Sequence, residues 1–199
     1  MNATTTPVPA QHEPQLLGQI LVLIGGSAGI GLETARRARA EGADVILVAR
    51  DPDRLERAAR EVDARSTAAF DATDPAALAR FFDGLPEGID HVLVTGPGPS
   101  YVPLLEMNAD QVRDELAGHV VLALEVARQA APKMRPGGTL LFMGGTPGRR
   151  ISRELGLVSA ATAVSPPFTG STRTRARAGP RQPDRRRLCR HTVVRIAAR

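Results

Sequence analysis

The sequence predicts an α/β protein with a doubly wound parallel sheet, on two observations. Short apolar runs alternate with longer stretches of helical pattern along most of the chain, as they do in βαβ units. The first apolar run, 20–24, leads through Gly25, Gly29 and Gly31 into a helix-forming run, 32–40. A strand that turns on glycines into a helix directs backbone N–H groups and the positive end of the helix dipole to one point. That turn is therefore predicted to bind a phosphate-containing ligand.

The later elements follow in the same alternation. Asp51 and Asp74 each precede a proline and a helical run, and both pairs are signals for the start of a helix. Apolar residues recur at helical spacing between 108 and 130, and Pro136 with two glycines interrupts the pattern. The strands expected after the first one span residues 43–49, 67–70, 89–95 and 139–143.

Glycines or charged residues follow the predicted strands. They lie at 25–31, Arg50, Asp71, 96–98 and 144–145. Because doubly wound sheets bind ligands at the carboxyl ends of their strands, we expect these residues to converge on one site. In the glycine turn the first glycine permits the turn, the second lets a pyrophosphate approach the backbone, and the third lets the helix pack on the strand. The sequence therefore predicts a nucleotide site.

The composition divides the chain into three parts. Residues 1–15 are predicted to be a disordered arm, 16–170 a single domain with its own core, and 171–199 a disordered, arginine-rich tail. The tail holds ten arginines and one acid, Asp184, so it carries a charge of +9, whereas the other 170 residues carry −4. The overall charge of +5 therefore does not favour a nucleic-acid partner for the domain.

Composition also excludes several classes of protein. The single cysteine, Cys189, leaves no disulfide framework and no cysteine-based metal site. Residues 1–14 lack the charged start and apolar centre of a signal peptide, and no apolar run is long enough to span a membrane. The sequence therefore predicts a cytoplasmic protein with no membrane partner and no metal.

The motifs resemble those of the short-chain dehydrogenase/reductase family over residues 19–170. The family's glycine signature, Thr-Gly-x-x-x-Gly-x-Gly, corresponds to 24–31, with Ile24 in place of the threonine. Asp71 stands where the family has an aspartate against the adenine, and 95–98 matches the family's Asn-Asn-Ala-Gly only at its last glycine. The resemblance implies a Rossmann fold, hydride transfer between NAD(P) and a small carbonyl or alcohol substrate, and a homo-oligomer.

The end of the second predicted strand bears on the choice of cofactor. An acid there binds the ribose 2′-hydroxyl of NAD, whereas an arginine accommodates the 2′-phosphate of NADP. The strand ends in Arg50, with Asp51 next to it, which favours NADP(H) over NAD. The alternative is that Arg50 is a solvated charge at the start of a helix. The cofactor-binding residues implied by the resemblance are Gly25, Ser27, Gly29, Ile30, Gly31, Arg50, Asp71, Ala72 and Gly96.

The family's catalytic residues are not matched. Alignment places Gly145 at the family's serine, Val158 at its tyrosine, Thr162 at its lysine and His119 near its helix asparagine. Valine cannot exchange a proton and threonine cannot supply a positive charge, so no catalytic residue is assigned. The lead interpretation is an oxidoreductase by descent. The alternative is a non-catalytic dinucleotide-binding protein, either a sensor or a broken copy of such an enzyme.

Four other polar residues are candidates for chemistry. Tyr101 is interpreted as half-buried packing rather than as a catalytic group. His119 is interpreted as a satisfied helix histidine rather than a base. Ser159 and Thr146 lie near the expected site, but neither has a visible base to activate it.

The sequence changes character after Gly170, where no apolar period remains. Back-translated with permitted codons and read one base later from Ser171, the tail can encode P-L-A-L-E-L-A-P-V-R-V-N-L-I-A-A-G-F-V-D-T-P-L-S. This string resembles the family's helix end, Val-Asn strand and glycine loop. The hypothesis is that 171–199 is a frameshift product and that the family's C-terminal strands are missing. The alternative is an arginine-rich nucleic-acid tail, although it lacks lysine and interleaved aromatic residues.

Overall fold

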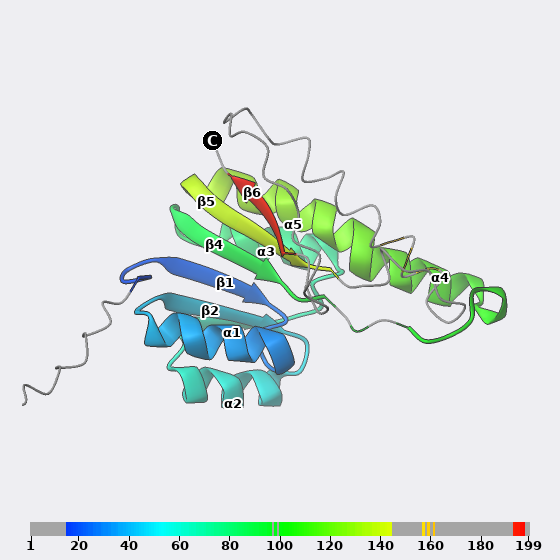
Figure 1. Ribbon diagram of the computed structural model, residues 1–199, viewed down its shortest axis with the longest axis horizontal. Helices are drawn as coiled ribbons and strands as arrows, with labels where there is room; N and C mark the ends of the chain where they lie inside the picture. Colours follow the sequence, from blue (N-terminus) through cyan, green and yellow to red (C-terminus); the bar gives the residue numbers. More distant parts are fainter. Residues whose placement is uncertain are drawn as a thin grey trace, which may run out of the picture.

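The computed structural model describes residues 15–96, 98, 100–144, 157, 159, 161 and, by their backbone alone, 193–197. Figure 1 shows a single twisted sheet with helices on both of its faces. The strand order is β3-β2-β1-β4-β5-β6, and the first five strands of that order are parallel. This order is that of a doubly wound sheet, as the sequence predicted.

The elements of the described residues have the following bounds. The strands are β1 (Ile20–Ile24), β2 (Asp44–Ala49), β3 (Ser66–Ala69), β4 (Ile89–Val94), β5 (Met134–Met143) and β6 (Val193–Ala197). The α-helices are α1 (Gly29–Ala40), α2 (Pro52–Val62), α3 (Pro75–Asp83), α4 (Ala109–Leu116) and α5 (Leu122–Ala130). A π-helical segment, η2 (Ala117–Val121), joins α4 to α5, and the 3-10 helices η1 (Leu104–Glu106) and η3 (Ala131–Lys133) flank this long helix.

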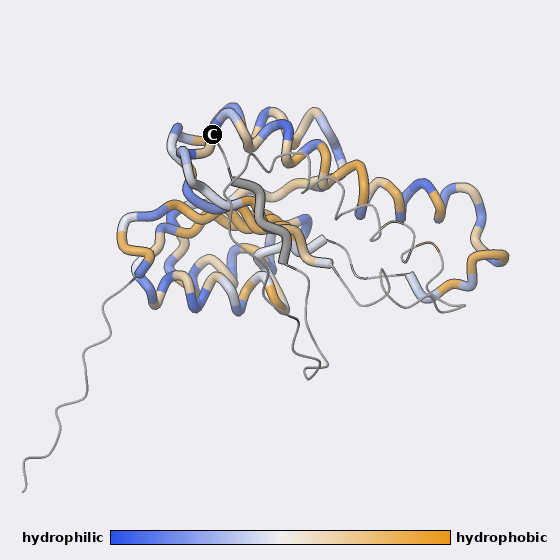
Figure 2. Tube along the Cα trace, turned by 45° about the horizontal axis from the view of Figure 1, so that its top comes forward, coloured by the Kyte–Doolittle hydropathy of each residue, from blue (hydrophilic) through white to orange (hydrophobic). Residues whose placement is uncertain are grey.

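Two apolar clusters hold the helices to the sheet. Alternate residues of β1 face opposite clusters: Leu21 and Leu23 pack with α1 and α2, whereas Val22 packs with α3 and α5. All five residues of β1 are buried, because a central parallel strand is covered on both faces. Figure 2 shows the apolar residues concentrated in the strands and on the inner sides of the helices. Both faces of the central strands are therefore covered by helices.

Side-chain caps fix the starts of most long helices. Asp51 accepts a hydrogen bond from the backbone N–H of Arg54 at the start of α2, and Asp74 caps α3 in the same way. Asn108 forms a capping box with Gln111 at the start of α4. Helix α1 differs, because its N-cap residue is Ala28 and no side chain caps it. The first N–H groups of α1 are therefore left for another acceptor.

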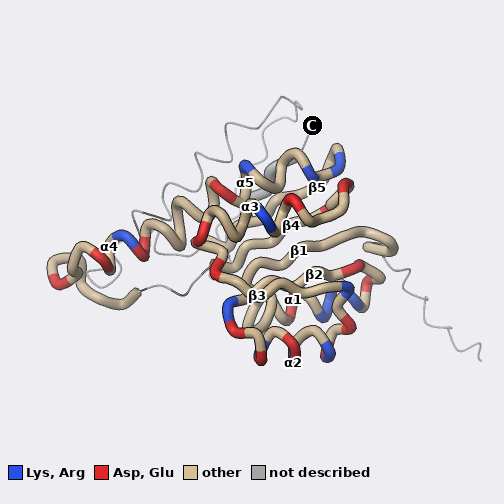
Figure 3. The backbone as a smooth tube through the Cα atoms, turned by 180° about the vertical axis from the view of Figure 1, so that it is seen from behind, with Lys and Arg blue, Asp and Glu red and all other residues tan. Residues whose placement is uncertain are grey.

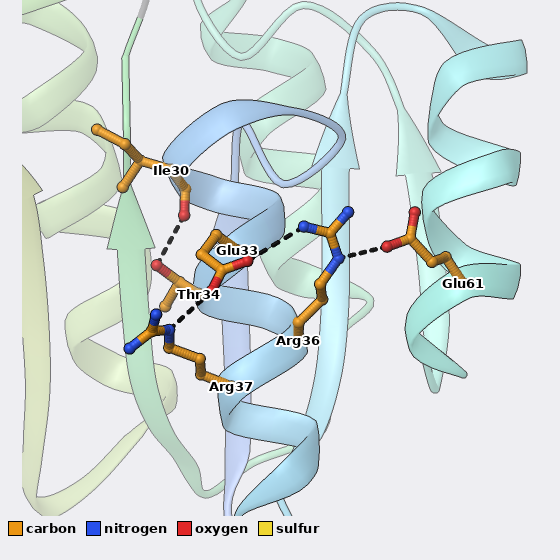
Figure 4. A network of polar contacts seen from close by, with 6 residues as sticks. All are labelled: Ile30, Glu33, Thr34, Arg36, Arg37 and Glu61. Carbon is orange, nitrogen blue, oxygen red and sulfur yellow. Dashed lines mark hydrogen bonds and ion pairs between the residues drawn. The ribbon is translucent and has the colours of Figure 1, made fainter.

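An ion-pair network joins α1 to α2, the two helices that cover one face of the sheet (Figure 4). Arg36 pairs with Glu61 of α2 and with Glu33 of its own helix, and Glu33 also accepts from Arg37 at 2.8 Å. Hydrogen bonds from Arg37 and then Arg36 hold the pKa of Glu33 below its usual value. Figure 3 shows that the charges lie mostly on the helices and turns, outside the apolar strands.

The expected strands and helices are found within a few residues, with two corrections. Strand β5 begins at Met134 and so includes Pro136 and the glycines that the sequence treated as a break. Gly137 has a φ of +83°, and the register to β4 shifts here, so these residues form an irregularity inside the strand. The predicted helix 108–130 contains the π-helical turn η2, which its apolar spacing did not indicate.

The sixth strand runs in the opposite direction to the others. The backbone of Val193–Ala197 pairs antiparallel with β5, with Ala197 opposite Thr139 and Val193 opposite Met143. These five residues fall in the tail, 171–199, that the sequence analysis expects to be disordered. Their sequence is rich in β-branched residues, and the edge of β5 offers unpaired backbone groups. The rest of 171–199 and the arm 1–14 lie outside the described residues.

Candidate functional site

A cleft opens at the carboxyl ends of β1, β2 and β4, where the glycine turn lies. Its volume is about 210 Å³, which is smaller than the roughly 300–1,000 Å³ of pockets that enclose a whole ligand. The cleft therefore fits part of a larger molecule, such as one half of a dinucleotide. The residues that line it are Ile24, Gly25, Ser27, Val48, Ala49, Arg50, Asp51, Arg54, Phe70, Asp71, Ala72, Thr73, Gly96 and Leu122.

The glycine turn is shaped by contacts that only glycine permits. A Cβ on Gly31 would lie 2.2 Å from the carbonyl oxygen of Gly25, so α1 can pack on the turn only without a side chain there. Gly25 has a φ of +91°, and a Cβ on it would lie 2.1 Å from the Thr95 hydroxyl oxygen. The N–H groups of Gly25 and Gly26 donate to the Val48 carbonyl at 2.9 and 3.1 Å. The turn is thus held against β2 and β4.

The start of α1 points its free N–H groups into this region. Because Ala28 offers no capping oxygen, the dipole and the uncapped donors favour an anion here. Gly29 has a φ of +52° and open space around it, and Ile30 is 48% exposed. Both lie on the first turn of α1, next to the cleft rather than among its lining residues. These features fit a phosphate group close to the backbone.

Asp71 is an ionised acceptor on the far wall of the cleft. Its Oδ1 accepts the Thr73 N–H at 2.9 Å and the Thr73 hydroxyl at 2.8 Å. The backbone bond from Thr73 is the largest of the effects that lower the pKa of Asp71, and the nearby charge of Arg50 adds to it. The Asx turn that results holds the 70–73 segment in place.

Two arginines stand beside the cleft at the start of α2. Arg50 is exposed and makes no hydrogen bond to the described residues, whereas Asp51 is engaged in capping α2 through Arg54 N–H at 2.9 Å. That bond holds the pKa of Asp51 below its usual value. The cleft wall therefore presents the guanidinium groups of Arg50 and Arg54, and the carboxylate of Asp51, which already caps α2.

The sequence analysis did not single out several residues of this site. Arg54 is a second cation on the cleft wall, and Leu122 of α5 closes its other side. Thr95 supports the glycine turn through its hydroxyl. This hydroxyl lies 3.3 Å from the Ile24 carbonyl oxygen and 3.4 Å from the Gly25 carbonyl oxygen, and it can donate a hydrogen bond to either. The capping signal Asp51-Pro52 could have indicated Arg54, because position N3 of a helix lies beside its own cap. Nothing in the sequence pattern pointed to Leu122.

The positions aligned with the family's catalytic group are mostly outside the described residues. This applies to Gly145, Thr146, Val158 and Thr162. Ser159 is buried, with 4% of its surface exposed. Tyr101 was expected to be half-buried, but it is 68% exposed, because the loop that follows β4 runs away from the sheet. His119 lies in η2 with its Nδ1 3.1 Å from the carbonyl oxygen of Glu115.

Comparison with known families decides what this site belongs to. Residues 19–173 match the short chain dehydrogenase family. The chain belongs to the short-chain dehydrogenase family. A very-long-chain 3-oxoacyl-CoA reductase of Scheffersomyces stipitis is 31% identical over an alignment of 149 residues, which covers 64% of this chain and 42% of that protein. The chain thus spans less than half the length of that relative.

Solved structures of short-chain dehydrogenases have the same fold. L-Sorbose reductase from Gluconobacter frateurii, complexed with NADPH and L-sorbose, superposes with a TM-score of 0.74 at 25% identity, over 80% of this chain and 65% of that one. A citronellol catabolism dehydrogenase of Pseudomonas aeruginosa gives a TM-score of 0.72 at 26% identity, over 82% and 70%. About a third of these relatives has no counterpart here.

The described residues form neither a membrane span nor a metal site. None of the helices there is long and apolar enough to cross a membrane. In the same part of the chain, no group of three or more His, Cys, Asp or Glu side chains is placed to hold a metal ion.

Proposed function

We propose that this chain is an NADP(H)-binding short-chain dehydrogenase that transfers hydride between the cofactor and a small carbonyl or alcohol substrate. The cleft beside the glycine turn is the observation that carries the proposal. It combines an uncapped helix start, glycines that no other residue can replace and an ionised aspartate. The bound nicotinamide would supply the hydride chemistry, and the chain's residues would bind and orient it.

Each wall of the cleft suits one part of the dinucleotide. The free backbone N–H groups at the start of α1, from Gly29, would donate hydrogen bonds to the pyrophosphate oxygens. Asp71 and Ala72 would hold the adenine. The hydrogen bond from Thr73 fixes the Asp71 carboxylate as an acceptor, and apolar residues of the lining lie next to it. The sorbose reductase, which has the same fold, is complexed with NADPH, which supports NADPH as the ligand. The volume of the cleft suits the adenosine half.

The preference for NADP over NAD rests on the charges at the start of α2. A carboxylate that binds the ribose hydroxyls must be available for hydrogen bonding, but Asp51 is already the cap of α2. Arg50 and Arg54 both line the cleft, and guanidinium groups bind phosphate in a bidentate manner. We therefore infer that the 2′-phosphate of NADP is held between these two arginines.

Turnover tests the proposal directly. The full chain should consume NADPH in the presence of a panel of aldehydes, ketones and diketones, and should do so faster than it consumes NADH. Saturable NADPH binding with no turnover on the panel would support the second candidate, a dinucleotide-binding protein without catalysis. The residues Gly145, Val158 and Thr162 at the family's catalytic positions favour that candidate.

We further propose that residues 171–199 derive from a shifted reading frame. The match to the family ends at residue 173, close to Ser171, where the alternative frame begins. The antiparallel direction of β6 also supports the proposal, because a parallel strand would continue the doubly wound sheet. Sequencing the gene tests it, and a frame that is intact there and shared by close relatives would contradict it. We also propose that the chain forms a homo-oligomer, which light scattering would test. Turnover on the carbonyl panel would identify the substrate class.

A further inference from the structure

A carboxylate and an imidazole form a pair at the junction of α4 and η2, outside the cofactor cleft. Glu115 is the one buried residue of α4, with 8% of its surface exposed. His119 follows one turn later, and its side chain is 13% exposed. The His119 Nδ1 lies 3.5 Å from Glu115 Oε1 and 3.1 Å from the Glu115 carbonyl oxygen. Buried charges of this kind are uncommon unless they are paired.

The neighbours of His119 define which of its nitrogens carries the proton. Both oxygens beside Nδ1 are acceptors, so the neutral imidazole has its hydrogen on Nδ1. Nε2 makes no hydrogen bond within the described residues, and its lone pair is available to exchange a proton. The Glu115 carboxylate and backbone carbonyl beside the Nδ1–H hold the ring in this tautomer.

The other described histidine has the opposite arrangement. His91 Nδ1 lies 2.6 Å from the Thr139 hydroxyl, and its Nε2 lies 2.6 Å from Gln19 Oε1. Both ring nitrogens are thus occupied, and the ring is near the amino end of β4, away from the cleft. His91 is a structural histidine, whereas His119 has one nitrogen left for chemistry.

Two contacts relate the pair to the cleft, whose lining includes neither Glu115 nor His119. Leu122, three residues after His119, lines the cleft. Glu115 Oε1 accepts the N–H of Ser100 at 3.4 Å, and Ser100 belongs to the same loop as Gly96, another lining residue. The pair therefore contacts the loop that follows β4. The π-helical turn that contains His119 is a local irregularity of the type that is frequent at functional sites.

We propose that His119 is the acid–base residue of this dehydrogenase and that Glu115 is its positioning residue. The inference rests on the proposed function. In the reduction, the substrate's carbonyl carbon accepts a hydride from the reduced nicotinamide, the carbonyl π bond opens, and the oxygen takes the proton from Nε2 of protonated His119. The imidazole then regains a proton from water. In the oxidation, Nε2 accepts the proton of the substrate hydroxyl.

The experiment compares three variants in the full chain with 9,10-phenanthrenequinone as the carbonyl probe. NADPH affinity, measured by titration, should stay within twofold in His119→Ala, Glu115→Gln and the control His91→Gln. Single-turnover reduction should fall at least about 100-fold in His119→Ala, since general acid catalysis contributes about 10²–10⁴-fold, and added imidazole should restore part of it. In Glu115→Gln the single-turnover rate should fall by less than in His119→Ala, and histidine ¹⁵N NMR should show that the neutral ring no longer prefers the Nδ1–H tautomer. Thermal unfolding of each variant checks that it is folded.

A second readout does not depend on turnover. Histidine ¹⁵N NMR of the wild-type chain should show His119 as the Nδ1–H tautomer when neutral, with His119→Ala used to assign its signal. A Nε2–H tautomer would overturn the proposal, and so would full reduction rates in His119→Ala or a wild type that binds NADPH and reduces no quinone. Failure of the wild type to bind NADPH would instead contradict the proposed function on which the inference rests.

Discussion

The half of the sheet from β1 to α3 and the half from β4 onward differ in how they are held. In the first half, α1 and α2 are joined to each other by ion pairs, and β1 and β2 are covered on both faces. In the second half, Leu116, Val121 and Leu124 of the long helix are 37–44% exposed, and β5 pairs with an antiparallel strand from the tail. Figure 1 shows α4 extending beyond the sheet.

This difference separates cofactor binding from substrate chemistry. The cleft is built mainly from residues between 24 and 73, so local sequence is enough to form it. The positions that align with the family's catalytic group fall in the second half. The two tasks therefore depend on different halves of the chain.

The largest expected effect concerns the packing of the first half. Leu47 of β2 is fully buried, and Leu47→Ala should lower the free energy of unfolding by about 2–5 kcal/mol, through lost burial and the cavity left behind. Leu124→Ala in α5, where the residue is 39% exposed, should change it by less than about 0.5 kcal/mol. Urea unfolding measures both. Equal costs would contradict the difference between the halves.

The next effect concerns the glycine turn. Gly31→Val should lower the free energy of unfolding by about 1–3 kcal/mol, because the new side chain overlaps the Gly25 carbonyl, and NADPH affinity should fall at least tenfold. Gly29→Ala is the matched control, since a Cβ there meets no atom within 4 Å. It should cost about 1 kcal/mol, from its positive φ alone. Urea unfolding of the pair checks this, and equal losses of stability would count against a packed turn.

The choice of cofactor gives a selective effect. Arg50→Gln should weaken NADPH binding by about 10–100-fold, because a hydrogen bond to a charged group contributes about 1.5–3 kcal/mol. NADH binding should be unchanged, since NADH has no 2′-phosphate. Arg54→Gln should give the same selectivity to a smaller degree. A parallel loss of both cofactors in Arg50→Gln would mean that the arginine does not contact the 2′-phosphate.

The smallest effect is a pH dependence at Asp71. Its pKa is lowered in the folded chain, first by the Thr73 N–H bond. A lowered pKa means that the stabilisation is present above the ordinary pKa of 3.8 and is lost as the pH falls through the lower folded value. Asp71→Asn should therefore destabilise the chain at neutral pH, by less than about 1 kcal/mol because the carboxylate is exposed. In unfolding curves measured at a pH below the folded pKa of Asp71, the free energies of unfolding of Asp71→Asn and wild type should become equal.

The fold was predictable because its signals are local. The glycine turn, the apolar strands and the Asp-Pro helix starts each act within a few residues, and the structure has these elements in the expected order. The part of the site that follows β1, β2 and β3 was predictable for the same reason, since topology brings strand ends together.

The remaining features depend on contacts that sequence spacing does not encode. The π turn η2 contains His119. The apolar residues around it still recur at the spacing of an ordinary helix, so the sequence pattern does not reveal the extra residue in this turn. The exposure of Tyr101 depends on where a loop runs. The pairing of β6 with β5 is set by an open strand edge far away in the chain, and the hydroxyl of Thr95 matters only because β4 lies next to β1.

Cofactor titration of the unmodified chain is the most direct test of the central claim, that the first half of the sheet forms a working NADP(H) site. Calorimetric titration with NADPH and with NADH, alongside Gly31→Val, measures it. The account predicts saturable binding at one site per chain, at least about tenfold tighter for NADPH, in line with one charged hydrogen-bond contact, and lost in the variant. Absence of saturable NADPH binding, or equal affinity for the two cofactors, would contradict it.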